Sequence, residues 1–102
     1  MIMFLHIGIT FADRPQIEEL EPVFNKAIDW LRYAANCWFV KTRKPPRVWL
    51  KRLRSQLATG DHVLIVQINP SQRSGLLPKW GWEWLAAQSK PQDNSSSGAA
   101  GF

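Results

Sequence analysis

Segments with the apolar pattern of strands alternate along this chain with segments that have the apolar pattern of helices, and this order restricts the folds open to it. Residues 2–11 are almost continuously apolar, which predicts a buried strand in the centre of a sheet. In residues 17–31, apolar side chains recur every three or four positions, as on one face of a helix. Pro22 interrupts this pattern, so it either starts the main helix or kinks it.

Three further segments continue the alternation. Residues 37–42 predict a strand, and the apolar residues 30–34 either pair with it through a turn at residues 35–36 or separate it from the helix before it. Residues 62–68 are apolar and β-branched, which predicts another buried strand. Residues 77–87 carry tryptophans at helical spacing and predict a short terminal helix.

A second helix is predicted between the last two strands. Pro46 is typical of the first residue of a helix, and Gly60 is typical of the left-handed residue that caps one. The apolar residues of this helix predict its core stripe: Trp49, Leu50, Leu53 and Leu57.

This order of elements predicts an α/β chain of the α+β type. The expected architecture is a ferredoxin-like split βαβ sandwich, with one mainly antiparallel sheet, two helices on one face and the Trp-rich helix at the C-terminus. With 102 residues, the chain fits one domain, which we assign to residues 1–87. Residues 88–102 are small and polar and predict a disordered tail. A second subunit or the Trp-rich helix would cover the open face of the sheet.

The predicted compartment is the cytoplasm. Cys37 is the chain's single cysteine, and a lone thiol suits a reducing environment. The apolar residues 1–10 are too few to span a bilayer and lack the features of a signal peptide. We therefore expect a soluble protein without a membrane partner.

Charge is distributed very unevenly along the chain. Residues 1–29 have a net charge of −3, whereas residues 30–60 carry eight basic residues and no acidic residue. Residues 61–102 contain three charges of each sign. A segment of this length without a carboxylate cannot neutralise itself locally, so we expect a positive field over one face of the protein.

This basic segment supplies the candidate binding residues, which come from a strand end, a loop and a helix: Lys41, Arg43, Lys44, Arg47, Lys51 and Arg54. Such a cluster is typical of contacts with successive phosphates of a nucleic acid. The alternative is a solvated helix face that the acidic residues of the first helix, Glu18, Glu19 and Glu21, partly neutralise.

Four short segments carry a resemblance to known proteins. They are Gly8-Ile9-Thr10-Phe11, Asp29-Trp30-Leu31-Arg32-Tyr33, Cys37-Trp38-Phe39-Val40-Lys41-Thr42 and Gly60-Asp61-His62-Val63-Leu64-Ile65-Val66. With the Trp-rich helix, this pattern resembles small, uncharacterised bacterial and phage proteins. These are related in fold to the second CRISPR-associated adaptation protein and to virulence-associated protein D. The resemblance covers residues 2–86 and implies a homodimer formed through sheet edges.

The resemblance also implies where a metal would bind in nuclease members, which hold a divalent cation with an Asp near the end of the first strand. Ala12 occupies the matching position here, and only Asp13, one residue later, could supply the carboxylate. Asp13 with Mg²⁺ or Mn²⁺ is therefore the alternative catalytic site. His6 and His62 have no metal-ligand spacing, so we expect no metal and no cofactor.

Three tryptophans alternate near the C-terminus, at Trp80, Trp82 and Trp84. Three indoles cannot all face one small core, so we expect at least one to lie in an interface.

The favoured hypothesis is a non-catalytic homodimer that binds nucleic acid or a nucleoprotein through its basic helix face. The first alternative is a metal-dependent, toxin-like endoribonuclease. The second is a phage-type or accessory protein that inhibits a host protein complex through the indole cluster.

Overall fold

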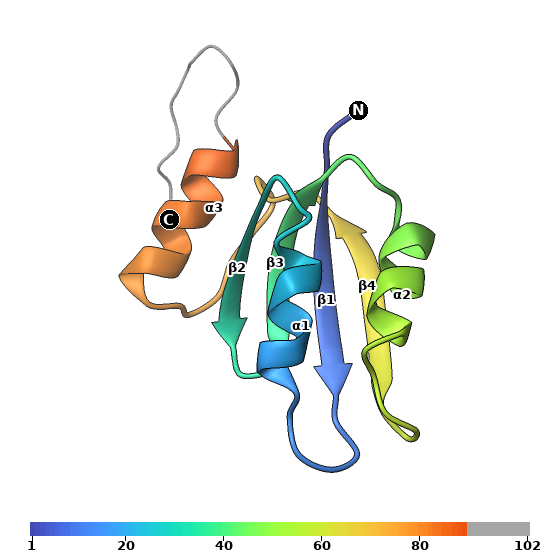
Figure 1. Ribbon diagram of the computed structural model, residues 1–102. Coiled ribbons are helices and arrows are strands. Elements are labelled where there is room, and N and C mark those ends of the chain that lie inside the picture. Colours follow the sequence, from blue (N-terminus) through green and yellow to red (C-terminus); the bar gives the residue numbers. More distant parts are fainter. Residues whose placement is uncertain (90–102) are drawn as a thin grey trace. The chain divides into compact units, whose positions relative to one another are not determined.

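Residues 1–89 are described by a computed structural model (Figure 1). In chain order, the elements are β1 (Met3–Thr10), α1 (Ile17–Phe24), β2 (Asp29–Ala34), β3 (Cys37–Thr42), α2 (Pro46–Arg54), β4 (His62–Ile68) and α3 (Lys79–Ser89). The chain divides into two compact units, residues 1–68 and the part from Asn69 onward, and each is described by itself.

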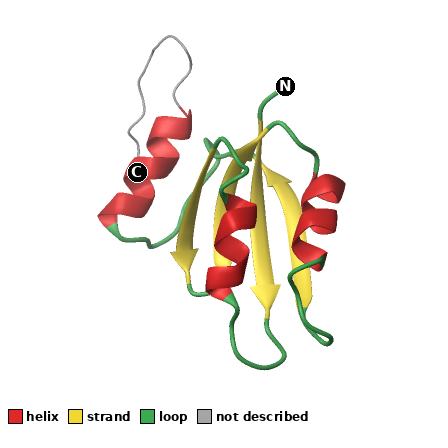
Figure 2. Cartoon of the chain, in the orientation of Figure 1, coloured by secondary structure: helices red, strands yellow, loops and turns green. Residues whose placement is uncertain are grey.

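The first unit is an α+β fold built on one four-stranded sheet in the order β2-β3-β1-β4. Each neighbouring pair of strands is antiparallel. As the sequence predicts, β1 is central, and α1 and α2 cover the same face of the sheet (Figure 2). This arrangement is consistent with a ferredoxin-like layout.

The hydrophobic core lies between this face and the two helices. Leu5, Ile7 and Ile9 alternate along β1 and are at most 1% exposed, because every second side chain of a strand faces the helices. From α1, the Phe24 ring stacks on Trp38 of β3, with ring centroids 4.5 Å apart and an interplanar angle of 11°. The aromatic contact anchors α1 to the middle of the sheet.

The first helix is shorter than predicted. The apolar pattern predicts a helix to residue 31, but α1 ends at Phe24, two residues after Pro22. The Ile28 N–H donates to the Lys41 carbonyl, 2.9 Å away, and Asp29 begins β2. Residues 29–31, which local periodicity assigns to the helix, therefore belong to β2 and pair with β3 instead. The hairpin between residues 30–34 and 37–42 is confirmed.

The second helix begins at Pro46, as predicted, but it ends earlier than the sequence suggests. Ser55 caps α2, so the prediction that Gly60 caps the helix is wrong. Gly60 instead has a φ of 93° in the turn before β4. A Cβ at Gly60 would lie 3.0 Å from the Ala12 Cβ, which makes glycine the residue that this turn and this close approach require.

The prediction that residues 62–68 form a buried strand is only half correct, because β4 exists but lies at the edge of the sheet. Leu64 is 64% exposed and Val66 is 40% exposed. Both residues point away from the face that the helices cover, where Val63 and Ile65 pack against the core. An apolar run alone cannot distinguish a strand buried on both faces from an edge strand.

The second unit contains the predicted Trp-rich helix. Pro78 directly precedes α3, whose backbone bond from Gly81 N to the Pro78 carbonyl measures 2.9 Å. Residues 88 and 89 belong to α3, and the remainder of the predicted tail, 90–102, lies outside the described residues. Within residues 1–89, no helix combines the length and apolar character that crossing a membrane requires.

Candidate functional site

The orientation of α2 follows from its two core residues. Trp49 and Leu53 lie one helical turn apart, and both are fully buried against the sheet. At about 100° per residue, Arg47, Lys51 and Arg54 fall on the opposite side of the helix. All three are exposed. We refer to Arg47, Lys51 and Arg54 as the α2 cations.

A buried hydrogen bond fixes α2 to β3. The Trp49 Nε1–H donates to the Thr42 Oγ1, 3.0 Å away, and Thr42 is only 2% exposed. The same oxygen accepts the backbone N–H of Lys44 at 3.0 Å, which holds the loop between β3 and α2. The Arg52 guanidinium lies 5.2 Å from the Trp49 ring centroid, a cation–π contact on the flank of the helix. The position of the α2 cations is therefore determined by packed neighbours.

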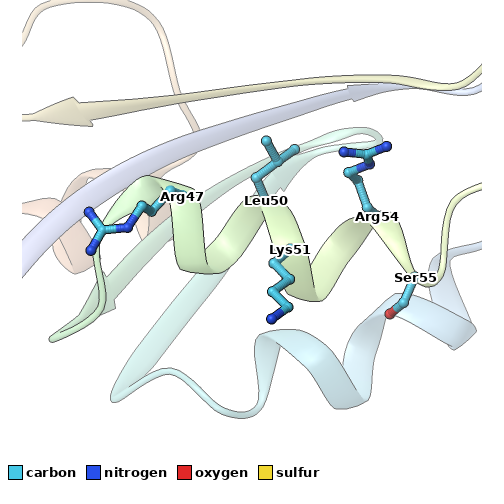
Figure 3. A pocket seen from close by; sticks show the side chains of 5 residues that line it. All are labelled: Arg47, Leu50, Lys51, Arg54 and Ser55. Carbon is cyan, nitrogen blue, oxygen red and sulfur yellow. The ribbon is translucent and has the colours of Figure 1, made fainter.

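An open depression of about 480 Å³ runs over this helix and is lined by Arg47, Leu50, Lys51, Arg54 and Ser55. Leu50 and Arg54 project to one side of α2, Lys51 and Ser55 project to the other, and Arg47 extends past the start of the helix (Figure 3). Leu50 is 38% exposed, so the prediction that it belongs to the core is wrong. Leu50 follows Trp49 directly, so its side chain lies about 100° further around the helix axis and points away from the sheet.

Two exposed residues of the preceding loop, Arg43 and Lys44, extend the positive charge. We call these two and the α2 cations together the basic surface. Within residues 1–89, none of these five side chains forms an ion pair. Glu18, Glu19 and Glu21 on α1 are also exposed and, in the same part of the chain, make no ion pair. The carboxylates of α1 therefore do not neutralise the basic surface by direct contact.

Lys41 does not lie with the other predicted binding residues. Val40 and Thr42, its neighbours on β3, are buried on the helix-covered face. Because side chains alternate along a strand, Lys41 lies on the other face, at the register position of Phe4 on β1 and Asp29 on β2. The sheet thus separates Lys41 from the basic surface.

The alternative catalytic residue, Asp13, is exposed in a bend after β1. The carboxylate that binds the backbone at this end of β1 is instead that of Asp61, a residue for which the sequence carries no signal of this role. Its oxygens accept the backbone N–H groups of Ala12 and Ala58, each at 2.8 Å. These two hydrogen bonds, that of Ala12 first, lower the pKa of Asp61. Among residues 1–89, no group of three or more His, Cys, Asp or Glu side chains could hold a metal.

A separate cluster lies on the sheet face opposite the helices. The Tyr33 hydroxyl and His6 Nε2 share a hydrogen bond, and the Tyr33 ring stacks on Phe39 with centroids 4.4 Å apart. Burial lowers the pKa of His6. Burial, followed by a hydrogen bond with the Cys37 thiol, raises the pKa of Tyr33 to about 12. Both rings are therefore neutral at physiological pH.

In α3, the three tryptophans differ in exposure. Trp80 is 48% exposed. Trp82 and Trp84 are half-buried, and each makes a contact of its own. Of the three predicted interface residues, Trp80 presents the largest free indole surface.

The chain matches no protein-family model, no curated protein and no solved structure. The geometry of residues 1–89 is therefore the basis for a functional interpretation.

Proposed function

We propose that this protein binds nucleic acid through its basic surface, by contacts with backbone phosphates. The observation that carries the proposal is that Arg47, Lys51 and Arg54 are exposed on the outer half of α2, away from its buried core residues, and form no ion pair within residues 1–89. At a rise of about 1.5 Å per residue, these cations form a row roughly 10 Å long. A row of this kind meets several phosphates of a strand without reading its sequence.

The number of cations sets the expected salt dependence. If all five side chains of the basic surface contact phosphates of duplex DNA, the affinity falls with a logarithmic slope of about −4.5. Raising the salt concentration from about 50 to 200 mM should then weaken binding by roughly 500-fold.

The test uses the triple variant Arg47→Glu, Lys51→Glu and Arg54→Glu. Its affinity for fluorescent RNA and DNA oligonucleotides of about 20 nucleotides, measured by anisotropy at about 0.1 M salt, should fall by at least about 100-fold. Because the three side chains are exposed, circular dichroism and thermal unfolding should remain close to those of the wild type.

A matched control changes net charge equally but leaves the basic surface intact. Arg14, Lys26 and Lys79 are exposed cations outside α2, and their replacement by Glu should weaken binding far less. Equal losses in the two triple variants would mean that net charge alone drives binding. Affinity that does not change with salt would contradict phosphate contact altogether.

The same RNA, incubated with Mg²⁺ or Mn²⁺, tests the endoribonuclease alternative. That alternative requires metal-dependent cleavage that Asp13→Ala abolishes. RNA that stays intact would rule it out under those conditions.

We also propose that the first unit is a ferredoxin-like sandwich, as its resemblance to the CRISPR adaptation protein and virulence-associated protein D implies. We further propose that the protein forms a homodimer in the cytoplasm. The strand order supports the sandwich. β4 supports the dimer, because it is an edge strand without a charged residue or proline and exposes Leu64 and Val66. Light scattering on the wild type and on Val66→Lys tests this proposal, which fails if the wild type is monomeric at high concentration.

Capture of a protein partner is the second candidate function, and the exposed indole of Trp80 favours it. Trp80→Ala should abolish co-purification of a specific host protein while leaving nucleic-acid affinity unchanged. The matched control is Lys79→Ala, which changes the neighbouring exposed residue but keeps the indole. If the same partner is retained by Trp80→Ala, the indole does not carry the interaction.

A further inference from the structure

Ser55 lies within the depression on α2, where nothing in the proposed function requires a hydroxyl group. It is the C-cap residue of α2 and is exposed to solvent. Its hydroxyl donates to the Arg52 carbonyl, 2.9 Å away. Lys51, one helical turn earlier, projects to the same side of the helix, and Arg54 is its immediate neighbour (Figure 3).

The sequence before Ser55 is strongly basic, with Lys51, Arg52 and Arg54 at four, three and one residues upstream. Protein kinases that select basic substrates recognise cations at such positions through acidic pockets, by the charge complementarity that governs other transient contacts. We propose that Ser55 is a phosphorylation site whose modification releases nucleic acid from the basic surface. This inference rests on the proposed function and assigns a regulatory group to the same site.

The transfer requires a protein kinase and a nucleoside triphosphate bound to Mg²⁺. The Ser55 Oγ attacks the terminal phosphorus of the triphosphate, and an Oγ–P bond forms as the bond from that phosphorus to its bridging oxygen breaks. The nucleoside diphosphate leaves, and the hydroxyl proton passes to a carboxylate base of the kinase. Because Ser55 is exposed at the end of a helix, its one hydrogen bond to Arg52 is readily exchanged for a bond with water during the transfer.

The phosphoryl group would then compete with nucleic acid for the same cations. It adds a charge of about −1.5 to −2 and three acceptor oxygens. Placed at the negative end of the α2 dipole, it is held by Lys51, which projects to the same side of the helix, and by the adjacent Arg54 once the long side chain of Arg54 turns toward it. Two of the five cations of the basic surface are thereby occupied, so the logarithmic salt slope on single-stranded RNA should fall by about 1.4. At about 0.1 M salt, this change corresponds to roughly 25-fold weaker binding.

The first experiment compares full-length protein carrying phosphoserine at position 55, installed during translation, with unmodified protein. The probe is the 20-nucleotide RNA used above, and the expected loss of affinity of about 25-fold should be reversed by a phosphatase. The control carries phosphoserine at Ser74, an exposed loop serine of the second unit, and has the same net charge. It should bind within about threefold of unmodified protein, since local rather than total charge governs phosphate contacts.

The second experiment incubates the protein with Mg²⁺, ATP and a protein kinase that prefers basic substrates, and locates the product by peptide mass. Phosphate should appear on Ser55, and Lys51→Gln should slow its incorporation by at least about tenfold because an exposed cation that complements the kinase is lost. Absence of phosphate on Ser55, or equal RNA affinity of the phosphorylated and unmodified proteins, overturns the inference. If the unmodified protein binds RNA but phosphorylation has no effect, the inference alone fails. If the unmodified protein does not bind, the proposed function fails with it.

Discussion

The hydrogen bond between Trp49 and Thr42 makes a quantitative prediction about how α2 is held. In Thr42→Val, a side chain of nearly the same shape no longer accepts the Trp49 indole N–H, 3.0 Å away in the wild type. Trp49 is fully buried, so water cannot replace the lost acceptor. An orphaned buried donor costs about 1–3 kcal/mol, and we expect a loss of about 2 kcal/mol of unfolding free energy. For a domain of this size, the melting temperature should fall by roughly 8–16 °C.

Urea unfolding followed by circular dichroism measures this loss, and two further variants isolate its cause. Thr42→Ser keeps the oxygen and loses one methyl group, so it should cost only about 0.8 kcal/mol. In a Trp49→Phe background, which has no indole N–H, Thr42→Val removes only the acceptor of the Lys44 N–H, so it should cost at least about 1 kcal/mol less than in the wild type. If Thr42→Val costs the same in both backgrounds, the hydrogen bond is not what fixes α2 to the sheet.

Two further predictions concern the turn before β4. Gly60→Ala should lower the free energy of unfolding in urea by about 1–2 kcal/mol, because φ at Gly60 is 93° and the new Cβ would lie 3.0 Å from the Ala12 Cβ. The control is Gly8→Ala, which should be tolerated because its Cβ would lie 3.7 Å from the nearest atom. The folded-state pKa of Asp61 is lowered below its ordinary value of 3.8, so its contribution to stability is fully present above that value and is lost as the pH falls through the folded-state pKa. The difference in unfolding free energy between wild type and Asp61→Ala should therefore be constant at neutral pH and shrink in acid, and a constant difference throughout would show that the carboxylate charge does not matter.

Local sequence signals predicted the elements whose ends are set locally. Pro46 starts α2 because proline lacks the N–H that the first helical position leaves unused. The end of α1 escaped prediction because the Ile28 N–H pairs with the Lys41 carbonyl on another strand. Gly60 has the predicted left-handed conformation, but it serves a turn that contacts Ala12, far away in sequence. At the end of α1, a nonlocal strand pairing therefore overrides helical periodicity.

In the candidate site, too, features set by local sequence were predicted and features set by tertiary packing were not. Helical spacing predicted that Arg47, Lys51 and Arg54 lie on the outward side of α2, and all three are exposed there, since that depends only on the helix itself. The separation of Lys41 from them depends on which face of β3 the helices cover, which tertiary packing decides. Likewise, Thr42 carries no sequence signal for its bond to Trp49, because the two meet only after α2 folds back onto the sheet.

The acidic residues of α1 provide a last test of how charge acts in this protein. Glu18, Glu19 and Glu21 form no ion pair within residues 1–89, yet α1 and α2 are neighbours on the same face of the sheet. Packed helices lie about 8–10 Å apart, which is close to the Debye length of about 10 Å at 0.1 M salt.

These carboxylates should therefore weaken the field of the basic surface at low salt without contacting it. Replacing all three with Gln should raise nucleic-acid affinity several-fold at about 20 mM salt, mainly through faster association, and have little effect at about 300 mM. Stopped-flow binding at both salt concentrations separates this screening effect from direct pairing. An affinity gain that persists at high salt would mean that the glutamates pair with the α2 cations in solution, and the proposed phosphate contacts would then have to displace them.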